Sequence, residues 1–149
     1  MRRRTATAIA LAFLAAGCGV DSGSGVGDGA GDVEEVILTV YVADEAVAEW
    51  TLAEIESEFE HVTVVVDGDE QTGPRLSDVL NASGVGEWSR AEVLGKGEGR
   101  SFDVAVEVTA AEVDETWVLD ITKRGTLKLA SPELPKEQWV RDAGEIRIP

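Results

Sequence analysis

The chain has 149 residues, which suits one domain with a modest core and is too short for two. Its 29 acidic and 13 basic residues give a formal net charge of −16, which argues against nucleic acid as a partner because phosphate binding needs clustered Lys and Arg. One Cys and one His exclude a disulfide framework within the chain and metal sites built from several Cys or His.

The first eighteen residues indicate where the protein goes. Three Arg at positions 2–4 precede an apolar run over residues 5–16, which is too short to cross a bilayer as a helix. The run ends in Ala15-Ala16-Gly17-Cys18, which resembles the lipobox of bacterial lipoproteins. The resemblance implies that the Cys18 thiol is acylated and that residues 1–17 are removed as a lipoprotein signal peptide. The alternative is an ordinary signal peptide, cut after an Ala, that leaves Cys18 as a spare thiol.

A tether is expected to follow the anchor. Residues 18–32 are rich in Gly, Ser and Asp, so they have little to bury and form a flexible spacer. Removal of residues 1–17 takes away three Arg and leaves a formal net charge of about −19. Such a chain is repelled by anionic headgroups. We therefore expect a globular domain over residues 33–149, anchored by lipid at Cys18 on the extracytoplasmic face of the cell membrane.

The first half of this domain alternates short strands with one helix. The β-branched run 36–42 predicts a buried strand, and residues 46–50 predict a second extended piece. Thr51 with Glu54 fits a capping box, so a helix is predicted to begin there. Residues 62–66 predict another strand that ends in the tight-turn signal Asp67-Gly68.

The middle of the domain predicts a second helix. Gly73-Pro74 is expected to open it, with Pro at the first helical position, because Pro is favoured there. Leu76, Val79 and Leu80 then fall at the spacing of a core-facing stripe, and Gly84 is expected to close the helix in a left-handed conformation.

The remainder is predicted to be mostly β-structure. Two strands over 90–94 and 101–108 are joined by a turn over 95–99, and Thr109 with Glu112 forms a second capping box for one short helical turn. Strands over 117–122 and 126–130 form a hairpin, and 145–148 is a last strand. The fold class is therefore α+β, with mixed or antiparallel sheets and a few short helices.

Motifs of known chemistry are scarce. The acidic run 67–70 lacks the Gly and Glu that an EF-hand loop requires further on, so a hairpin turn is the better interpretation. His61 has no nucleophile motif to serve and is expected at the surface. The glycine-rich stretch 95–99 lacks the Lys-Ser/Thr of a phosphate-binding loop. The four Trp are expected to fill volume in the core or at its rim.

Two stretches resemble one known family. Residues 62–85, with Thr72-Gly73-Pro74-Arg75-Leu76 at their centre, resemble the oxidoreductase molybdopterin-binding domain of the sulfite oxidase family. Residues 125–132, together with Gln138-Trp139-Val140 and Glu145-Ile146, are similar to the end of that domain. The resemblance implies a similar fold for the globular domain.

The resemblance also implies which cofactor groups are missing. Family members bind molybdenum through a Cys in the loop that here reads Val66-Asp67-Gly68-Asp69-Glu70-Gln71, and this loop has no Cys. We therefore expect no cofactor and no catalytic residue, and a binding or accessory module rather than an enzyme. The alternative is a molybdopterin-dependent oxidoreductase, or a subunit of one, that still binds the pterin.

The resemblance finally suggests a candidate cleft. The positions that flank the cofactor in the family correspond here to Asp67, Arg75, Lys123, Arg124 and Lys128. Four cations on a strongly acidic protein favour a small anionic ligand or an acidic patch of an envelope protein. The alternative is that these cations only pair with neighbouring carboxylates.

Overall fold

The computed structural model describes residues 34–96 and 104–149 of the chain. The predicted signal peptide, Cys18 and the tether lie outside the described residues. So do residues 97–103, which hold most of the predicted turn 95–99 and the start of the predicted strand 101–108.

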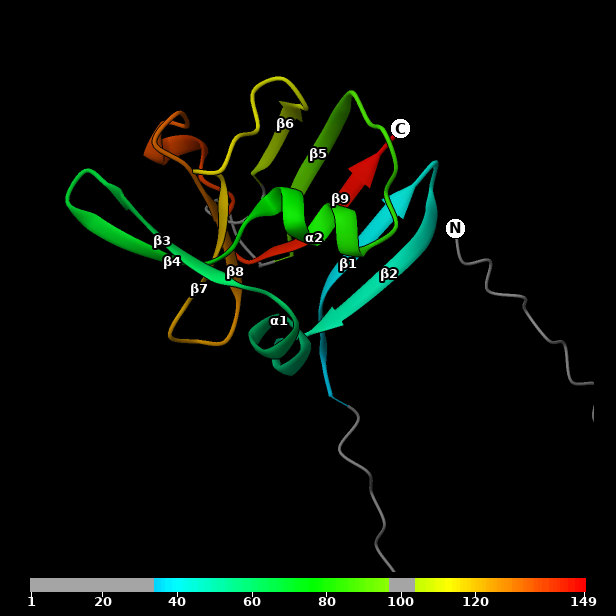
Figure 1. Ribbon diagram of the computed structural model, residues 1–149, viewed down its shortest axis with the longest axis horizontal. Coiled ribbons are helices and arrows are strands. Elements are labelled where there is room, and N and C mark those ends of the chain that lie inside the picture. The colour runs from blue at the N-terminus through cyan, green and yellow to red at the C-terminus, as the bar shows by residue number, and fades with distance from the viewer. Residues whose placement is uncertain (1–33, 97–103) are drawn as a thin grey trace, which may run out of the picture. The chain divides into compact units, whose positions relative to one another are not determined.

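The described part is an α+β fold built on a five-stranded mixed sheet, with strand order β2-β1-β9-β5-β6 (Figure 1). Strands β1 and β9 run parallel, and the other neighbouring pairs of this sheet are antiparallel. The predicted strands are therefore present, although their ends shift by a few residues. The bounds are β1 Val36–Val42, β2 Glu45–Thr51, β5 Arg90–Gly95, β6 Ala105–Thr109 and β9 Ala143–Ile148.

Two short helices accompany the sheet. Helix α1 covers Leu52–Glu58 and begins with the predicted capping box, in which Thr51 and Glu54 bond each other's backbone N–H. Helix α2 covers Leu76–Ala82 and lies across one face of the sheet (Figure 1). It buries the predicted stripe of Leu76, Val79 and Leu80, and Gly84 follows it at a φ of 75°. No helix in residues 34–96 and 104–149 is long and apolar enough to cross a membrane.

Two hairpins lie beside the large sheet. Strands β3 (His61–Val66) and β4 (Asp69–Pro74) are joined by Asp67-Gly68, whose φ values of 52° and 86° are those of a type I′ turn. Strands β7 (Val118–Ile121) and β8 (Leu127–Ala130) form the predicted second hairpin. Strand β4 lies alongside β7, and the backbone N–H of Thr72 in β4 donates to the side chain of Asp120 in β7 at 2.7 Å.

The predicted opening of the second helix is wrong. Gly73 and Pro74 end strand β4, and α2 begins at Leu76 with Arg75 as its N-cap. Gly73 is needed for close packing instead, because a Cβ at this position would collide with the carbonyl oxygen of Leu119 in β7. Pro74 is tolerated because it stands at the end of the strand, where its missing N–H breaks no ladder bond.

The core lies between the sheet, α2 and the β7–β8 hairpin. Trp117 and Trp139 are buried, and Trp50 and Trp88 pack against the core from its rim, as predicted. Only half of the second predicted capping box forms. Glu112 accepts from the backbone N–H of Thr109, but the Thr109 hydroxyl donates to the Glu112 carboxylate, and the Glu112 N–H donates to the Thr109 carbonyl oxygen instead. The residues that follow form one hydrogen-bonded turn rather than a helix. A one-turn 3₁₀ helix, η1 (Lys136–Gln138), precedes Trp139.

Candidate functional site

A polar pocket of about 500 Å³ lies between the β3–β4 hairpin, β8 and the segment around η1. Strand β4 supplies three side chains, β8 supplies one cation, and the segment around η1 supplies two cations and an aromatic ring. The lining residues are Asp69, Glu70, Gln71, Lys128, Lys136, Trp139 and Arg141.

Trp139 forms the fixed wall of this pocket. Its side chain is buried, and its indole N–H donates to the carbonyl oxygen of Leu134 at 3.0 Å, which fixes the ring. The ammonium groups of Lys128 and Lys136 lie 5.2 and 5.7 Å from the ring centroid, within the range of a cation–π contact. Strand β8 also forms an isolated bridge between Lys128 and Arg141, which brings these two residues to one edge.

The two lysines already have counter-ions. Lys128 lies 3.0 Å from a carboxylate oxygen of Asp120, and Lys136 lies 3.0 Å from Asp69 and 3.7 Å from Asp67. The hydrogen bond that Lys136 donates to Asp69 raises the pKa of Lys136, so this lysine stays charged at neutral pH.

Two polar groups of the pocket have no partner within the described residues. The guanidinium of Arg141 is exposed and makes no ion pair with residues 34–96 or 104–149. Gln71 is only 3% exposed, yet its side-chain oxygen accepts no hydrogen bond there. An unpartnered buried amide oxygen is costly, so it favours a bound donor.

The structure places the predicted site residues in different surroundings. Lys128 lines the pocket, and Asp67 lies at its edge through the ion pair with Lys136. Arg75 faces Glu60 and Asp78 at 3.4 and 3.5 Å, outside the lining set. Arg124 lies 3.0 Å from Asp142, and it lines a separate hollow beside α1. Lys123 is exposed in the turn between β7 and β8.

Lys136, Trp139 and Arg141 were not among the candidate site residues that the sequence suggested. They follow Pro132 and Pro135, which interrupt regular structure, and a residue's position after such an interruption says little about what it faces. The available signal was local, because two cations lie within three residues of a Trp in an otherwise acidic chain.

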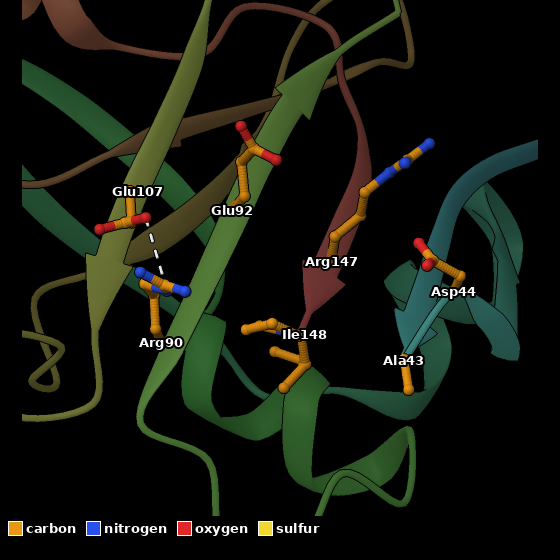
Figure 2. Close-up of a pocket in the computed structure, with 8 residues that line it drawn as sticks. Ala43, Asp44, Arg90, Glu92, Glu107, Arg147 and Ile148 are labelled. Atoms are coloured by element: carbon orange, nitrogen blue, oxygen red, sulfur yellow. Dashed lines mark ion pairs between the residues drawn. The ribbon is translucent and has the colours of Figure 1, made fainter.

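A second hollow, of about 560 Å³, lies over the exposed face of the large sheet (Figure 2). Figure 2 shows the Arg90 side chain turned toward Glu107, and the two groups are 3.5 Å apart. Arg147 lies 2.8 Å from Glu145, and this carboxylate raises the pKa of Arg147. Since both cations pair with carboxylates of the same sheet, Glu107 exposed and Glu145 half-buried, we interpret this hollow as part of the ordinary polar surface of the sheet.

The pocket beside Trp139 presents charged, amide and aromatic side chains. Its lining residues include no Ser, Cys or His, so they offer neither a hydroxyl or thiol nucleophile of those types nor an imidazole base. In residues 34–96 and 104–149, no group of three or more His, Cys, Asp or Glu could hold a metal ion.

Comparisons with known proteins identify no family for this chain. No protein-family model matches the chain, and no curated protein matches it. The resemblance to the molybdopterin-binding domain therefore stays a prediction.

Proposed function

We propose that the chain is a lipid-anchored, extracytoplasmic binding module with a cofactor-free fold similar to the molybdopterin-binding domain. It takes a small anionic ligand in the pocket beside Trp139. The observation that carries the proposal is the exposed Arg141 guanidinium, which has no counter-ion within the described residues although carboxylates outnumber cations in the chain.

The acidic net charge does not oppose such a ligand at contact distance. Salt screens charges that lie beyond about 8–10 Å, so the nearest groups dominate the field inside the pocket. There, Lys128 and Lys136 pair with their own carboxylates, Arg141 adds a positive charge, and the exposed Glu70 adds a negative one, so the attraction on an anionic ligand comes from direct contact with the Arg141 guanidinium. A planar guanidinium binds carboxylate or phosphate through two parallel hydrogen bonds.

The buried oxygen of Gln71 restricts the ligand further. It can only accept a hydrogen bond, so the bound molecule should carry a hydroxyl, amine or amide N–H as well as its anionic group. The wall formed by Trp139 suits a flat or apolar part of the same molecule.

The residues of the hairpin do not fit molybdenum. The predicted ligand loop is reduced to the two-residue turn Asp67-Gly68, and this turn offers no thiolate. For this reason we prefer a binding module to a molybdopterin-dependent oxidoreductase. Stoichiometric molybdenum or extractable pterin in the purified protein would overturn this choice.

The binding proposal is tested with citrate and inorganic pyrophosphate as anionic probes of the full chain, by calorimetry at low and high salt. We expect one of them to bind with an affinity that falls with salt, and Arg141→Glu to lower this affinity at least tenfold. The matched control is Arg90→Glu, which changes the same charge on the sheet face. Equal loss in both variants, or no binding of either probe, contradicts the proposal.

The anchor is tested separately. Cys18→Ser should abolish incorporation of labelled fatty acid and retention in the membrane fraction, because it removes the thiol that would be acylated. Equal labelling of the Cys18→Ser protein would show that the lipobox interpretation is wrong, whatever the pocket binds.

A further inference from the structure

We infer that the outer edge of β3 is a docking site for an extended segment of a partner protein, which adds to the β3–β4 hairpin as a third strand. Strand β3 pairs with β4 along one side, and no other strand in the described part of the chain pairs with its second side. Main-chain hydrogen bonds along such an edge are the basis of recognition by strand addition.

The register identifies which backbone groups face outward. In a hairpin closed by a two-residue turn, the flanking residues Val66 and Asp69 form a hydrogen-bonded pair, and the pairs alternate from there. The N–H and C=O groups of Thr63 and Val65 therefore point away from β4. The same alternation holds on β4. The backbone N–H of Thr72, which is paired with Thr63, points away from β3 and donates to Asp120.

The hairpin holds this edge in a regular strand conformation. Its six residue pairs run without a bulge. Strand β4 is packed closely on β7 at Gly73, and Lys136 holds the end of the hairpin through Asp69. Because the edge is already in the strand conformation, a guest segment does not have to order it.

The edge lacks the devices that usually prevent strand addition. Residues 62–66 contain no charge and no Pro, and four of the five are Val. Val65 is 60% exposed, and Val47, at 43%, is the other exposed large hydrophobic residue of the described part. On the exposed face of β3, Val65 offers an apolar contact beside Thr63, while Val62 and Val64 lie partly buried on the opposite face, so β-branched side chains suit the guest.

The charges at the two ends of the β3 edge determine which kind of partner segment can bind there. Glu58 and Glu60 precede β3, and Glu70, opposite Val65, follows the turn. Among residues 34–96 and 104–149, only Glu60 of these three has a cation nearby, Arg75. A second copy of this chain would place carboxylates against carboxylates in either orientation, which is unfavourable. A segment with an apolar centre and Lys or Arg at both ends complements the edge instead.

The test uses a labelled peptide with a Val-Thr-Val-Thr-Val centre and two Lys at each end, titrated against the full chain by fluorescence anisotropy. We expect binding that weakens at high salt and a matched peptide with Glu at both ends that does not bind. Val65→Pro should weaken binding at least tenfold, because it removes an outward N–H without breaking a bond to β4. Val65→Thr, which keeps the N–H, should bind within threefold of the unmodified chain.

Amide exchange in the unmodified chain gives a second measurement that does not depend on the folding of a variant. Added peptide should slow exchange at Thr63 and Val65 and leave Val64, already bonded to β4, unchanged. Equal binding by Val65→Pro and Val65→Thr, or no slowing at Thr63 and Val65, overturns the inference. Self-association that Val65→Pro abolishes, without peptide binding, overturns it in favour of a second copy as the occupant.

Discussion

Asp120 connects the β3–β4 hairpin to a lysine of the pocket through its carboxylate. Replacing it tests quantitatively how much these interactions contribute to stability. Its carboxylate accepts the N–H of Thr72 at 2.7 Å and lies 3.0 Å from the ammonium of Lys128. The Asp120 side chain is 12% exposed and that of Lys128 is 21% exposed, so water screens the pair only in part. Asp120→Ala removes both interactions and leaves the lysine without its counter-ion.

The expected loss follows from these two interactions. Breaking a fully buried ion pair costs about 3–5 kcal/mol, and partial exposure places this pair at the lower end or below. A hydrogen bond to a charged acceptor contributes about 1.5–3 kcal/mol. This contribution and that of the ion pair do not simply add, because the same carboxylate makes both interactions. We therefore expect Asp120→Ala to lower the free energy of unfolding by about 2–4 kcal/mol. At about 4 °C per kcal/mol for a domain of this size, Tm should fall by roughly 8–16 °C.

Asp120→Asn separates the two contributions. The amide oxygen still accepts from Thr72, while the charge opposite Lys128 is lost, so the expected loss is about half that of Asp120→Ala. Urea unfolding followed by circular dichroism measures both variants. The double variant Asp120→Ala with Lys128→Met should be more stable than Asp120→Ala alone, because no unpaired cation remains. Losses below about 0.5 kcal/mol in both single variants would refute the reasoning.

Three further predictions concern helix packing, hairpin packing and pH. Leu80→Ala should cost about 2–5 kcal/mol in urea unfolding because its side chain is buried, whereas Ser77→Ala, at a half-buried position outside the buried stripe of α2, should stay within about 0.5 kcal/mol. Gly73→Ala should push β4 off β7 and cost about 1–3 kcal/mol, seen as faster amide exchange in both strands, and unchanged exchange would disprove the close approach. The raised pKa of Lys136 means that its ion pair with Asp69 stabilises the fold at neutral pH and is lost as pH rises through that raised pKa. The Tm values of the chain and of Lys136→Met should therefore converge above about pH 10.4, and a constant difference up to pH 12 would contradict this assignment.

The sequence predicted those parts of the fold that are determined locally. The β-branched runs of β1 and β3, the Asp67-Gly68 turn and the Thr51 capping box each carry their own signal, and the structure confirms them. Strand β4 could not be predicted, because four of its six residues, the Asp, Glu, Gly and Pro of Asp-Glu-Gln-Thr-Gly-Pro, are of types depleted in strands. It is a strand because the turn returns the chain along β3 and because β7 packs on its other side, and neither partner is visible in a local window.

The candidate site was predictable to a smaller degree. Lys128 was identifiable because it lies within a stretch that resembles a known domain. Arg141 and Trp139 reach the pocket through an irregular segment with two Pro and a single 3₁₀ turn, and no periodicity indicates where such a segment runs. The pairing of Lys128 with Asp120 depends on the register between β7 and β8, and the turn between those strands contains five residues.

The position of β9 has a consequence for how the chain reaches its folded state. Strand β9 lies between β1 and β5, so the centre of the large sheet is formed by residues that follow β1 by roughly one hundred positions. Pairing over such a distance must close a long loop before any contact is gained, which slows folding. Until residues 143–148 have been synthesised, β1 and β5 have no strand between them. Deletion of these six residues should therefore abolish cooperative unfolding of the whole domain rather than loosen only one edge.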